Sequence, residues 1–505
     1  MLDVDTLPKR YVYKVAASLV SAVINFAILL LVPKALGPVY YGIFIYLQQF
    51  FTQLVAVLDL GASSAFFSKI SAKNNRKELI KFFFLFFCLM LFFIIVAALS
   101  FQYFELNQID EKIIEDEYIY LAAILSIAIY LMSNITNLFD GYGRSISLEK
   151  YRIISKILSF LMLIYFVYSL DFNLSLFYLF NISVILIFLF ISYFSFSADS
   201  RLEFFKSITH SCINWKEILR EVYLFSSPLF IHTLIISAST IFDIWLLKEL
   251  HGGAEVGYYG VALAISQIPI MFISPLVPLI VRECSILNGS NNIKEMQIIY
   301  NKYIIGAYIF IAFVSFNVFF QAENILMFFG NEYSDSFHAL LLFALFPITQ
   351  TIHQLSGSVF IATEQTKNIR DTSIFVSVVG IILSVLFMYI LDLGAVGLGG
   401  KMLIVGFITL NIQTYYIGRI IKISYKSLLL KLIQPLLILL VIVWVTHFYM
   451  SDISTSVIIN IFIPGFISML FVIISFIAYP KLYGVTIVSR QKIIPIILKY
   501  FNINN

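Results

Sequence analysis

Asp243 is the residue of this sequence whose type and surroundings most clearly suggest ion chemistry. It lies in the stretch STIFDIWLLKEL, where its nearest neighbours are apolar. A carboxyl group removed from water tends to lose its charge unless it is paired. Such a group can exchange a proton or a sodium ion, so Asp243 is a candidate ion-coupling residue. The alternative is a structural role as a partner of Lys14 or Lys248.

Polar side chains also recur at helical spacing in two separate stretches. The first set, at i, i+4, i+7 and i+11, comprises Lys14, Ser18, Ser21 and Asn25. The second set, 218 positions later, comprises His232, Ile236, Ser239 and Asp243, of which all but Ile236 are polar. This spacing places each set on one helix face. Polar groups are costly in hydrocarbon and usually face a cavity or a partner helix. We interpret the two stripes as lining a water-filled cavity between two halves of the chain, with interhelical hydrogen bonding as the alternative.

A third group of polar side chains extends this candidate substrate-binding set. Its members are Gln48, Gln49, Gln267, Arg282 and Lys401. Gln267 lies 218 positions after Gln49, and Arg282 ends a stretch that three prolines interrupt, as often happens where transporter helices break. Lys401 lies near an expected outer membrane edge, where snorkelling to the interface is the alternative.

The elements that would carry these residues are membrane-spanning helices. Sixty per cent of the 505 residues are hydrophobic and 12% are charged, against roughly a quarter charged in soluble domains. Apolar runs of the length needed to cross a bilayer, about 20 residues, recur throughout the chain. We therefore predict an all-α, multi-pass membrane protein with about fourteen spans. They are 11–33, 42–64, 80–102, 118–139, 150–170, 174–196, 221–247, 256–281, 300–321, 337–361, 372–391, 394–418, 430–450 and 455–479.

The charges between the spans predict the orientation. With a cytoplasmic N-terminus, all but four of the 33 Lys and Arg residues fall on the cytoplasmic side or its edge. The four exceptions are Lys34, Lys112, Lys248 and Lys401. This asymmetry follows the positive-inside rule. The acidic loop at 105–118 fits the outer face. Both termini are therefore expected in the cytoplasm.

The chain also contains an internal repeat. The stretch LGPVYYGIF at 36–44 returns as AEVGYYGVA at 254–262, so the two YYG triplets are 218 residues apart. Six spans in each half would make the halves parallel repeats, which are common in secondary transporters. The expected domains are a bundle at 1–200, a cytoplasmic linker at 201–220, a bundle at 221–425, and two additional spans with a cytoplasmic amphipathic tail at 426–505. Chance similarity between apolar spans is the alternative.

Several kinds of site have no sequence support. The chain contains no P-loop, no G-x-S-x-G, no H-E-x-x-H and no cysteine-rich cluster. We therefore predict no catalytic residues, no metal, no cofactor and no nucleic-acid partner. Transport would be driven by a gradient or by the substrate itself.

Short motifs carry a family resemblance. The stretches LGPVYYGIF, LDLGASSAFFSKIS at 58–71, FDGYGRS after the fourth span and VGYYGVALAI at the eighth are similar to those of the polysaccharide transporter branch of the superfamily that also holds multidrug and toxin extruders. This resemblance covers roughly the first twelve spans. It implies a flippase that moves undecaprenyl-pyrophosphate-linked units, such as O-antigen units of lipopolysaccharide, from the inner to the outer leaflet of a bacterial inner membrane. It further implies two six-helix bundles in a V around a central cavity.

The resemblance also implies roles for individual residues. Lys14, His232 and Arg282 would attract the pyrophosphate or acidic sugars. Sugar hydroxyls would be bound by Gln48, Gln49 and Gln267, and Asp243 would couple transport to a cation. The expected partners are the undecaprenyl pyrophosphate carrier, membrane lipids, and the polymerase and chain-length machinery of the same pathway. The two extra spans also resemble those of related lipid II flippases, although the scarcity of arginine among the candidate cavity residues favours another cargo.

Two other functions are consistent with the sequence. A cation-coupled exporter of drugs or metabolites would use the same cavity. A membrane-embedded glycosyl polymerase would act on the same lipid-linked sugars, with the six acidic residues at 105–117 as its candidate catalytic groups. That loop is too short to fold alone, so we predict a transporter rather than an enzyme.

Overall fold

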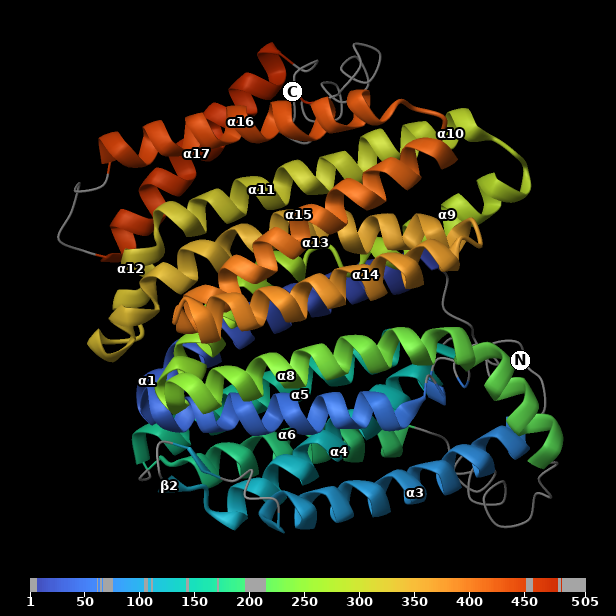
Figure 1. Cartoon of the computed structure of the whole chain (residues 1–505), viewed down its shortest axis with the longest axis vertical. Coiled ribbons are helices and arrows are strands. Elements are labelled where there is room, and N and C mark those ends of the chain that lie inside the picture. Colours follow the sequence, from blue (N-terminus) through green and yellow to red (C-terminus); the bar gives the residue numbers. More distant parts are fainter. Residues whose placement is uncertain are drawn as a thin grey trace, which may run out of the picture. The chain divides into compact units, whose positions relative to one another are not determined.

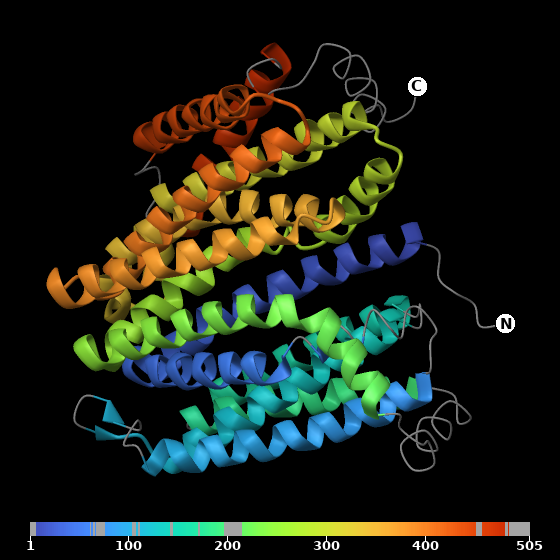
Figure 2. The same cartoon turned by 45° about the vertical axis from the view of Figure 1, so that its right-hand side comes forward.

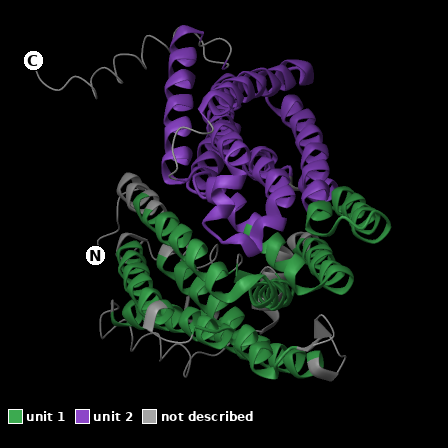
Figure 3. Cartoon of the chain, turned by 90° about the vertical axis from the view of Figure 1, so that its left-hand side faces the viewer, with its two compact units in different colours: residues 1–261, 373–398 green, residues 262–372, 399–505 purple. Residues whose placement is uncertain are grey.

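The computed structural model describes residues 7–60, 62–63, 66, 76–103, 108–109, 112–141, 145–169, 172–195, 215–450, 457–479 and 483. Most of the linker predicted at 201–220 and nearly all of the predicted cytoplasmic tail lie outside these residues. The chain divides into two compact units (Figure 3). Unit 1 comprises residues 1–261 and 373–398, and unit 2 comprises residues 262–372 and 399–505. The division predicted from the repeat, into two six-helix bundles and two further spans, stays a prediction.

Unit 1 is built of long helices, because a backbone in hydrocarbon must satisfy its own hydrogen bonds. They are α1 (Leu7–Asp59), α3 (Arg76–Tyr103), α4 (Asp116–Gly141), α5 (Ser145–Ser169), α6 (Leu174–Ser195) and most of α8 (Trp215–Ile270) and α14 (Thr366–Ser384), the last continued by a π-helix at Val385–Ile390. α1 packs against α4 and α5, and α6 packs against the same two helices. Strands β1 (Gln108–Ile109) and β2 (Lys112–Ile113) form a small antiparallel hairpin beside one end of α3 (Figures 1 and 2).

Unit 2 surrounds one continuous apolar core. Its helices are α9 (Leu276–Gly289), α10 (Ile293–Ile299), α11 (Ile305–Phe320), α12 (Ala322–Met327), α13 (Phe337–Ala362), most of α15 (Gly394–Ile420), α16 (Tyr425–Met450) and α17 (Val457–Ala478). A π-helical turn at Tyr300–Ile304 joins α10 to α11. α11 lies between α13 and α16, and α17 packs against α16 (Figure 1). Tyr300, Ile352 and Leu439 are fully buried in this core.

The helices confirm the prediction of an all-α membrane protein. All fourteen predicted spans overlap described helices, and α1 and α8 each contain most of two of them. Ten described segments, one of which covers most of both spans of α1, are long and apolar enough to cross a membrane. Many apolar side chains on these helices are exposed, including Leu161, Tyr165, Phe462 and Phe466. Exposed side chains of this type suit contact with lipid.

α1 and α8 bend at equivalent glycines. Gly37 has φ 75° and ψ 167°, and Gly252 has φ 82° and ψ −176°. Glycine tolerates this left-handed region because it lacks a Cβ atom. The two bends are 215 residues apart, whereas the YYG triplets are 218 apart. In the register of the bends Asn25 corresponds to Thr240 instead of Asp243. The alignment of the two stripes is therefore shifted by nearly one helical turn from the one expected.

The segments after these two bends approach each other closely within unit 1. A Cβ atom added at Gly42 would overlap the carbonyl oxygen of Gly253, and one added at Gly257 would overlap the carbonyl oxygen of Pro38. Position 253 is 215 after 38, and position 257 is 215 after 42, so the two contacts are reciprocal. Small residues permit such backbone contact between membrane helices.

Residues flanking the α8 bend hold the turn between α14 and α15. Glu255 Oε2 accepts a 2.7 Å hydrogen bond from the Ala395 backbone N–H at the start of α15. His251 Nε2 lies 3.1 Å from the carbonyl oxygen of Met388 in the π-helical segment. A side chain of α8 thus caps a helix start 140 residues away in the sequence.

The proline-rich stretch breaks the helix as expected. α8 ends at Ile270, one residue after Pro269, and α9 begins at Leu276, directly after Pro275. Proline lacks the N–H that would continue the helical hydrogen-bond pattern. This break places Arg282 on α9.

Candidate functional site

The carboxyl group of Asp243 is buried and has a partner from a distant helix. Its side chain comes from the middle of α8, and the residue is 9% exposed. Ser384, the last residue of α14, places its Oγ 2.5 Å from Asp243 Oδ1. The same Oγ lies 2.9 Å from the carbonyl oxygen of Gly380. Sequence analysis identified Asp243 but missed Ser384, because nothing in the sequence brings position 384 next to position 243.

One serine proton therefore lies between two acceptors. When Asp243 is ionised, the Ser384 hydroxyl can donate to the carboxylate. When Asp243 is protonated, its O–H can donate to Ser384 Oγ, which then donates to the Gly380 carbonyl. The arrangement satisfies hydrogen bonding in both protonation states, as a site that exchanges a cation requires.

The α1 stripe faces a set of charges on α5. Asn25 Oδ1 accepts a 2.9 Å hydrogen bond from Lys156 Nζ. Ser21, one turn earlier on α1, is 8% exposed, and its Oγ has no hydrogen-bond partner within the described part of the chain. Lys14 and Ser18 belong to α1, and their side chains lie outside the described residues. Of the described stripe residues, Asn25 thus contacts α5.

Sequence analysis missed the charges on α5. Glu149, Arg152 and Lys156 follow i, i+3, i+7 spacing, so they share one helix face. Arg152 Nη1 lies 3.1 Å from Glu149 Oε2, and Glu149 is 2% exposed. This spacing is visible in the sequence, across the start of the span predicted at 150–170.

The glutamines of the second apolar run form some hydrogen bonds with neighbouring side chains. Gln48 Nε2 donates to Thr52 Oγ1 at 3.0 Å and to Ser126 Oγ of α4 at 3.3 Å. Gln48 Oε1 is buried and accepts no hydrogen bond from the described residues. Gln49 is half-buried. Nearby, Gln53 Oε1 accepts a 2.8 Å hydrogen bond from Ser237 of α8.

A second carboxylate network was not foreseen. Asp59, the last residue of α1, accepts hydrogen bonds from Tyr130 Oη at 2.6 Å and from Ser63 Oγ at 2.5 Å. The Ser63 backbone N–H also donates to it, at 3.2 Å. Three donors thus converge on one carboxylate. This environment differs from that of Asp243 and fits a structural role.

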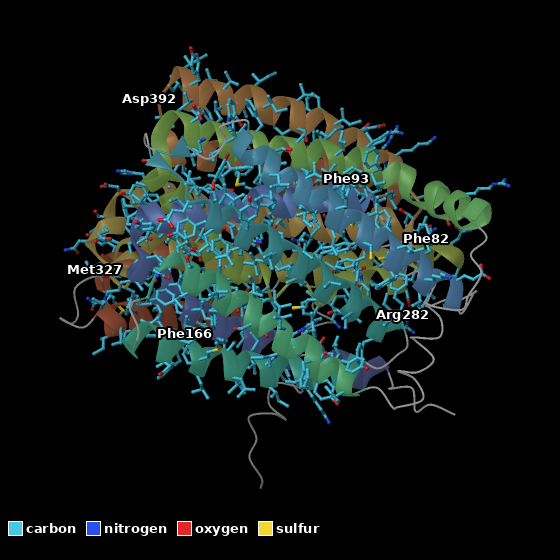
Figure 4. All side chains as sticks on the ribbon, turned by 90° about the horizontal axis from the view of Figure 1, so that it is seen from below. Phe82, Phe93, Phe166, Arg282, Met327 and Asp392 are labelled. Atoms are coloured by element: carbon cyan, nitrogen blue, oxygen red, sulfur yellow. The ribbon has the colours of Figure 1, made fainter. Side chains whose placement is uncertain are left out.

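The other predicted site residues have varied surroundings. His232 lies on α8, with its side chain outside the described residues. Unit 2 contains Gln267, which is exposed, and Lys401, which is 6% exposed. Arg282 Nη1 pairs with its neighbour Glu283 at 2.8 Å, and both side chains are about half exposed. Figure 4 shows Arg282 and Met327 at opposite ends of unit 2. Whether these residues bind substrate stays a prediction.

Comparisons with known proteins agree with the resemblance seen in the sequence. The model of a family described as polysaccharide biosynthesis protein matches residues 9–281. No curated protein sequence matches the chain.

Solved structures share the fold. The lipid II flippase MurJ, in an inward closed conformation, has a TM-score of 0.68 and 18% identity, over 93% of this chain and 99% of that one. An inward-facing multidrug resistance MATE family transporter of the MOP superfamily has a TM-score of 0.60 and 16% identity, over 84% and 98%. A MOP superfamily transporter from Pyrococcus furiosus has a TM-score of 0.57 and 16% identity, over 82% and 97%. At such identities the likeness concerns the fold alone.

Proposed function

The chain belongs to the family of polysaccharide biosynthesis proteins, and from that premise we propose that it is a flippase for lipid-linked polysaccharide units. It would move undecaprenyl-pyrophosphate-linked repeat units, such as O-antigen units, from the inner to the outer leaflet of a bacterial inner membrane by alternating access. Its N- and C-termini would lie in the cytoplasm. The lipid carrier is the expected partner, together with the polymerase and chain-length machinery of the same pathway.

The observation that carries this proposal is the polar contact between α1 and α5 within unit 1. Asn25 and Lys156 meet at 2.9 Å on helices whose other faces expose apolar side chains such as Val23 and Leu161. Polar and charged side chains inside membrane helices usually mark a substrate or ion pathway. The lysine cation can bind an anionic headgroup, and the asparagine amide can hydrogen-bond to sugar hydroxyls. The pair therefore suits a cargo that carries both groups.

Asp243 and Ser384 would supply the coupling. Their geometry accommodates either a protonated or an ionised carboxyl group, since the serine hydroxyl can reverse its role between donor to Asp243 and acceptor from it. We propose that a proton or sodium ion exchanges at Asp243 during each transport cycle. A polyprenyl-linked cargo would then cross the membrane without direct consumption of ATP.

A cation-coupled exporter of drugs or metabolites is the second candidate. Multidrug resistance MATE transporters share the fold, at a TM-score of 0.60 for one of them, so the same architecture can serve this function. A buried carboxyl group such as that of Asp243 serves either transporter. The cargo, and not the coupling site, distinguishes the two functions.

Deletion of the gene in its host tests the proposal. We expect single undecaprenyl-linked units to accumulate in the inner leaflet, where they are protected from a membrane-impermeant glycosidase added to spheroplasts. Mass spectrometry of extracted lipids would identify them, and a plasmid-borne wild-type gene should remove them. Units that reach the outer leaflet but stay unpolymerised would contradict flipping and favour a polymerase. Unchanged lipids with increased drug sensitivity would favour the exporter.

A further inference from the structure

Unit 1 contains two half-buried cations on one helix: Lys156, and Arg152, whose side chain is 26% exposed. Arg152 and Lys156 lie one turn apart on α5, which packs against α1 (Figure 1). Lys156 Nζ donates to Asn25 Oδ1 at 2.9 Å. Arg152 Nη1 contacts Glu149, and its Nε is buried without a hydrogen-bond partner within the described part of the chain. Lys156 has an amide oxygen beside it, and no described carboxylate lies within 4.0 Å of its Nζ.

The charges of this cluster do not balance. Arg152 and Lys156 contribute two positive charges, and Glu149, which is 2% exposed, contributes one negative charge. Lys156 is half-buried, and a charge partly removed from water without a counterion is unfavourable. An anion bound next to Lys156 would remove this imbalance. The cluster is therefore better suited to bind an anionic ligand than to stabilise the helix pair alone.

The helical phase points the two cations away from lipid. The exposed apolar residues of α5 follow the spacing of one stripe and are Ile154, Ile157, Leu158, Leu161 and Tyr165. At 100° per residue, Lys156 lies about 140–200° from Leu158 and Leu161 around the helix axis. Ser159 and Leu163, which share the face of the cations, are buried. The cations thus face away from the exposed apolar stripe, and Lys156 contacts Asn25 of α1.

The side-chain chemistry fits a pyrophosphate group. The guanidinium of arginine matches phosphate oxygens with a fork of N–H donors, and lysine adds a compact point charge. Residues four apart on a helix have Cβ atoms about 5–6 Å from each other, so one extended anion with two phosphates can contact both. The buried hydroxyl of Ser21, which has no partner among the described residues, lies on the adjoining helix face.

We propose that Arg152 and Lys156 bind the pyrophosphate group of a polyprenyl-pyrophosphate-linked substrate, with Asn25 orienting the Lys156 ammonium. This inference rests on the proposed function and names the residues of unit 1 that hold the headgroup. Lys156 is 11 residues from the start of α5 at Ser145, or about 16 Å along the helix at 1.5 Å per residue. Lys156 therefore lies inside the span predicted at 150–170.

Binding of farnesyl pyrophosphate to the purified full-length protein in detergent tests the proposal. We expect Lys156→Gln and Arg152→Gln each to weaken binding by at least about tenfold, equivalent to 1.4 kcal/mol. Lys156→Arg should retain most of the affinity because it keeps the charge. Lys150→Gln is the matched control, since it removes one positive charge from an exposed side chain of the same helix. Size-exclusion profiles and thermal unfolding would verify that each variant is folded.

Further ligands identify the source of the anion. Farnesol should bind equally weakly to all variants, and inorganic pyrophosphate should compete with farnesyl pyrophosphate in the wild type. Competition by phosphatidylglycerol alone, without an effect of inorganic pyrophosphate, would overturn the proposal in favour of a phospholipid headgroup. Equal losses in Lys156→Gln and Lys150→Gln would also overturn it.

The cellular experiment separates this inference from the proposed function. If the deletion strain accumulates inner-leaflet lipid-linked units and Lys156→Gln still clears them at the wild-type rate, the pyrophosphate site is wrong and flipping stands. If the deletion strain accumulates no such units, the proposed function fails whatever the binding data show.

Discussion

The hydroxyl of Ser384 lies 2.5 Å from the carboxylate of Asp243, joining residues that are 141 positions apart in the sequence. Both are buried, with Ser384 fully enclosed. Ser384 is followed at once by the π-helical segment of α14. Such segments in α-helices often occur at functional sites. The pair combines a titratable group, a reversible hydroxyl and an irregular helix in the interior of unit 1.

Replacement of Asp243 by asparagine should impair transport without loss of expression. The amide keeps the size of the side chain and a hydrogen bond to Ser384, but it cannot exchange a proton or bind a cation as an ionised carboxylate does. We expect clearance of lipid-linked units to fall clearly below that of the wild type, because ionisable residues inside membrane helices usually serve function. The measurement is complementation of the deletion strain, with protein levels determined by immunoblot.

Asp371→Asn is the control for this experiment, because it removes the same charge from a side chain that is 60% exposed. Wild-type transport by Asp243→Asn would exclude Asp243 from the mechanism. Ser384→Ala should give an intermediate defect, since it removes the partner but leaves the carboxyl group.

Replacement of Gly42 by alanine should destabilise the contact between α1 and α8. The new methyl group would overlap the carbonyl oxygen of Gly253, and backbone cannot move aside as a side chain can. Overpacking of this kind costs about 1–3 kcal/mol. The midpoint of thermal unfolding in detergent should therefore fall.

Gly306→Ala provides the comparison for Gly42→Ala, because a methyl group at Gly306 in α11 meets no atom within 4 Å. There alanine should leave stability unchanged or raise it by up to about 1 kcal/mol through its helix propensity. If both variants unfold at the same temperature, the close approach at Gly42 does not contribute to stability.

The spans could be predicted from the sequence because the signal is local. Each needs about 20 consecutive apolar residues, which a reader of the sequence can count. The register between α1 and α8 could not be obtained in the same way. Tyr40, Tyr41 and Gly42 recur 218 positions later, yet the backbone bends at Gly37 and Gly252, 215 apart. The repeated YYG triplet shows that two apolar helices have similar sequences. The positive φ values of Gly37 and Gly252 show where the backbone bends.

The candidate site was predicted only in part, for a related reason. A carboxyl group among apolar residues is conspicuous at Asp243, but Ser384 is one of many serines in helices and gains its meaning from a contact 141 residues away. Lys156 is a different case, since its same-face spacing with Glu149 and Arg152 is visible in the sequence. Its contact with Asn25 could not be predicted, because that contact depends on how α1 and α5 pack.

The hydrogen bond from Ala395 to Glu255 should stabilise the turn between α14 and α15. Glu255→Ala would leave the first backbone N–H groups of α15 without this acceptor, at a cost of about 1–2 kcal/mol. Glu255→Gln should lose less, because the amide oxygen can still accept. Gly394→Ala would place a methyl group 2.6 Å from Glu255 Oε2 at a residue with φ 52°.

A double-mutant cycle measures this relationship. Glu255→Ala and Gly394→Ala should be less destabilising together than the sum of the two single changes, since the first removes the atom with which the second collides. Thermal unfolding of the four proteins in detergent provides the numbers. Strict additivity would show that Gly394→Ala destabilises the protein through its backbone conformation alone.

The network around Gln321 should anchor α16 and α17 to α11 within unit 2. Gln321 Nε2 donates to His447 Nδ1 at 3.1 Å and to the Asn460 carbonyl oxygen at 2.9 Å. An accepting Nδ1 requires the proton on Nε2, which can then donate to Asn317 Oδ1 at 3.3 Å.

Gln321 is 3% exposed, so Gln321→Ala would leave buried acceptors unsatisfied, at a cost of about 1–3 kcal/mol in stability. The unfolding midpoint in detergent should fall clearly below that of Asn288→Ala, an exposed change expected to stay within about 0.5 kcal/mol of wild type. Equal midpoints would mean that apolar packing alone holds these two helices.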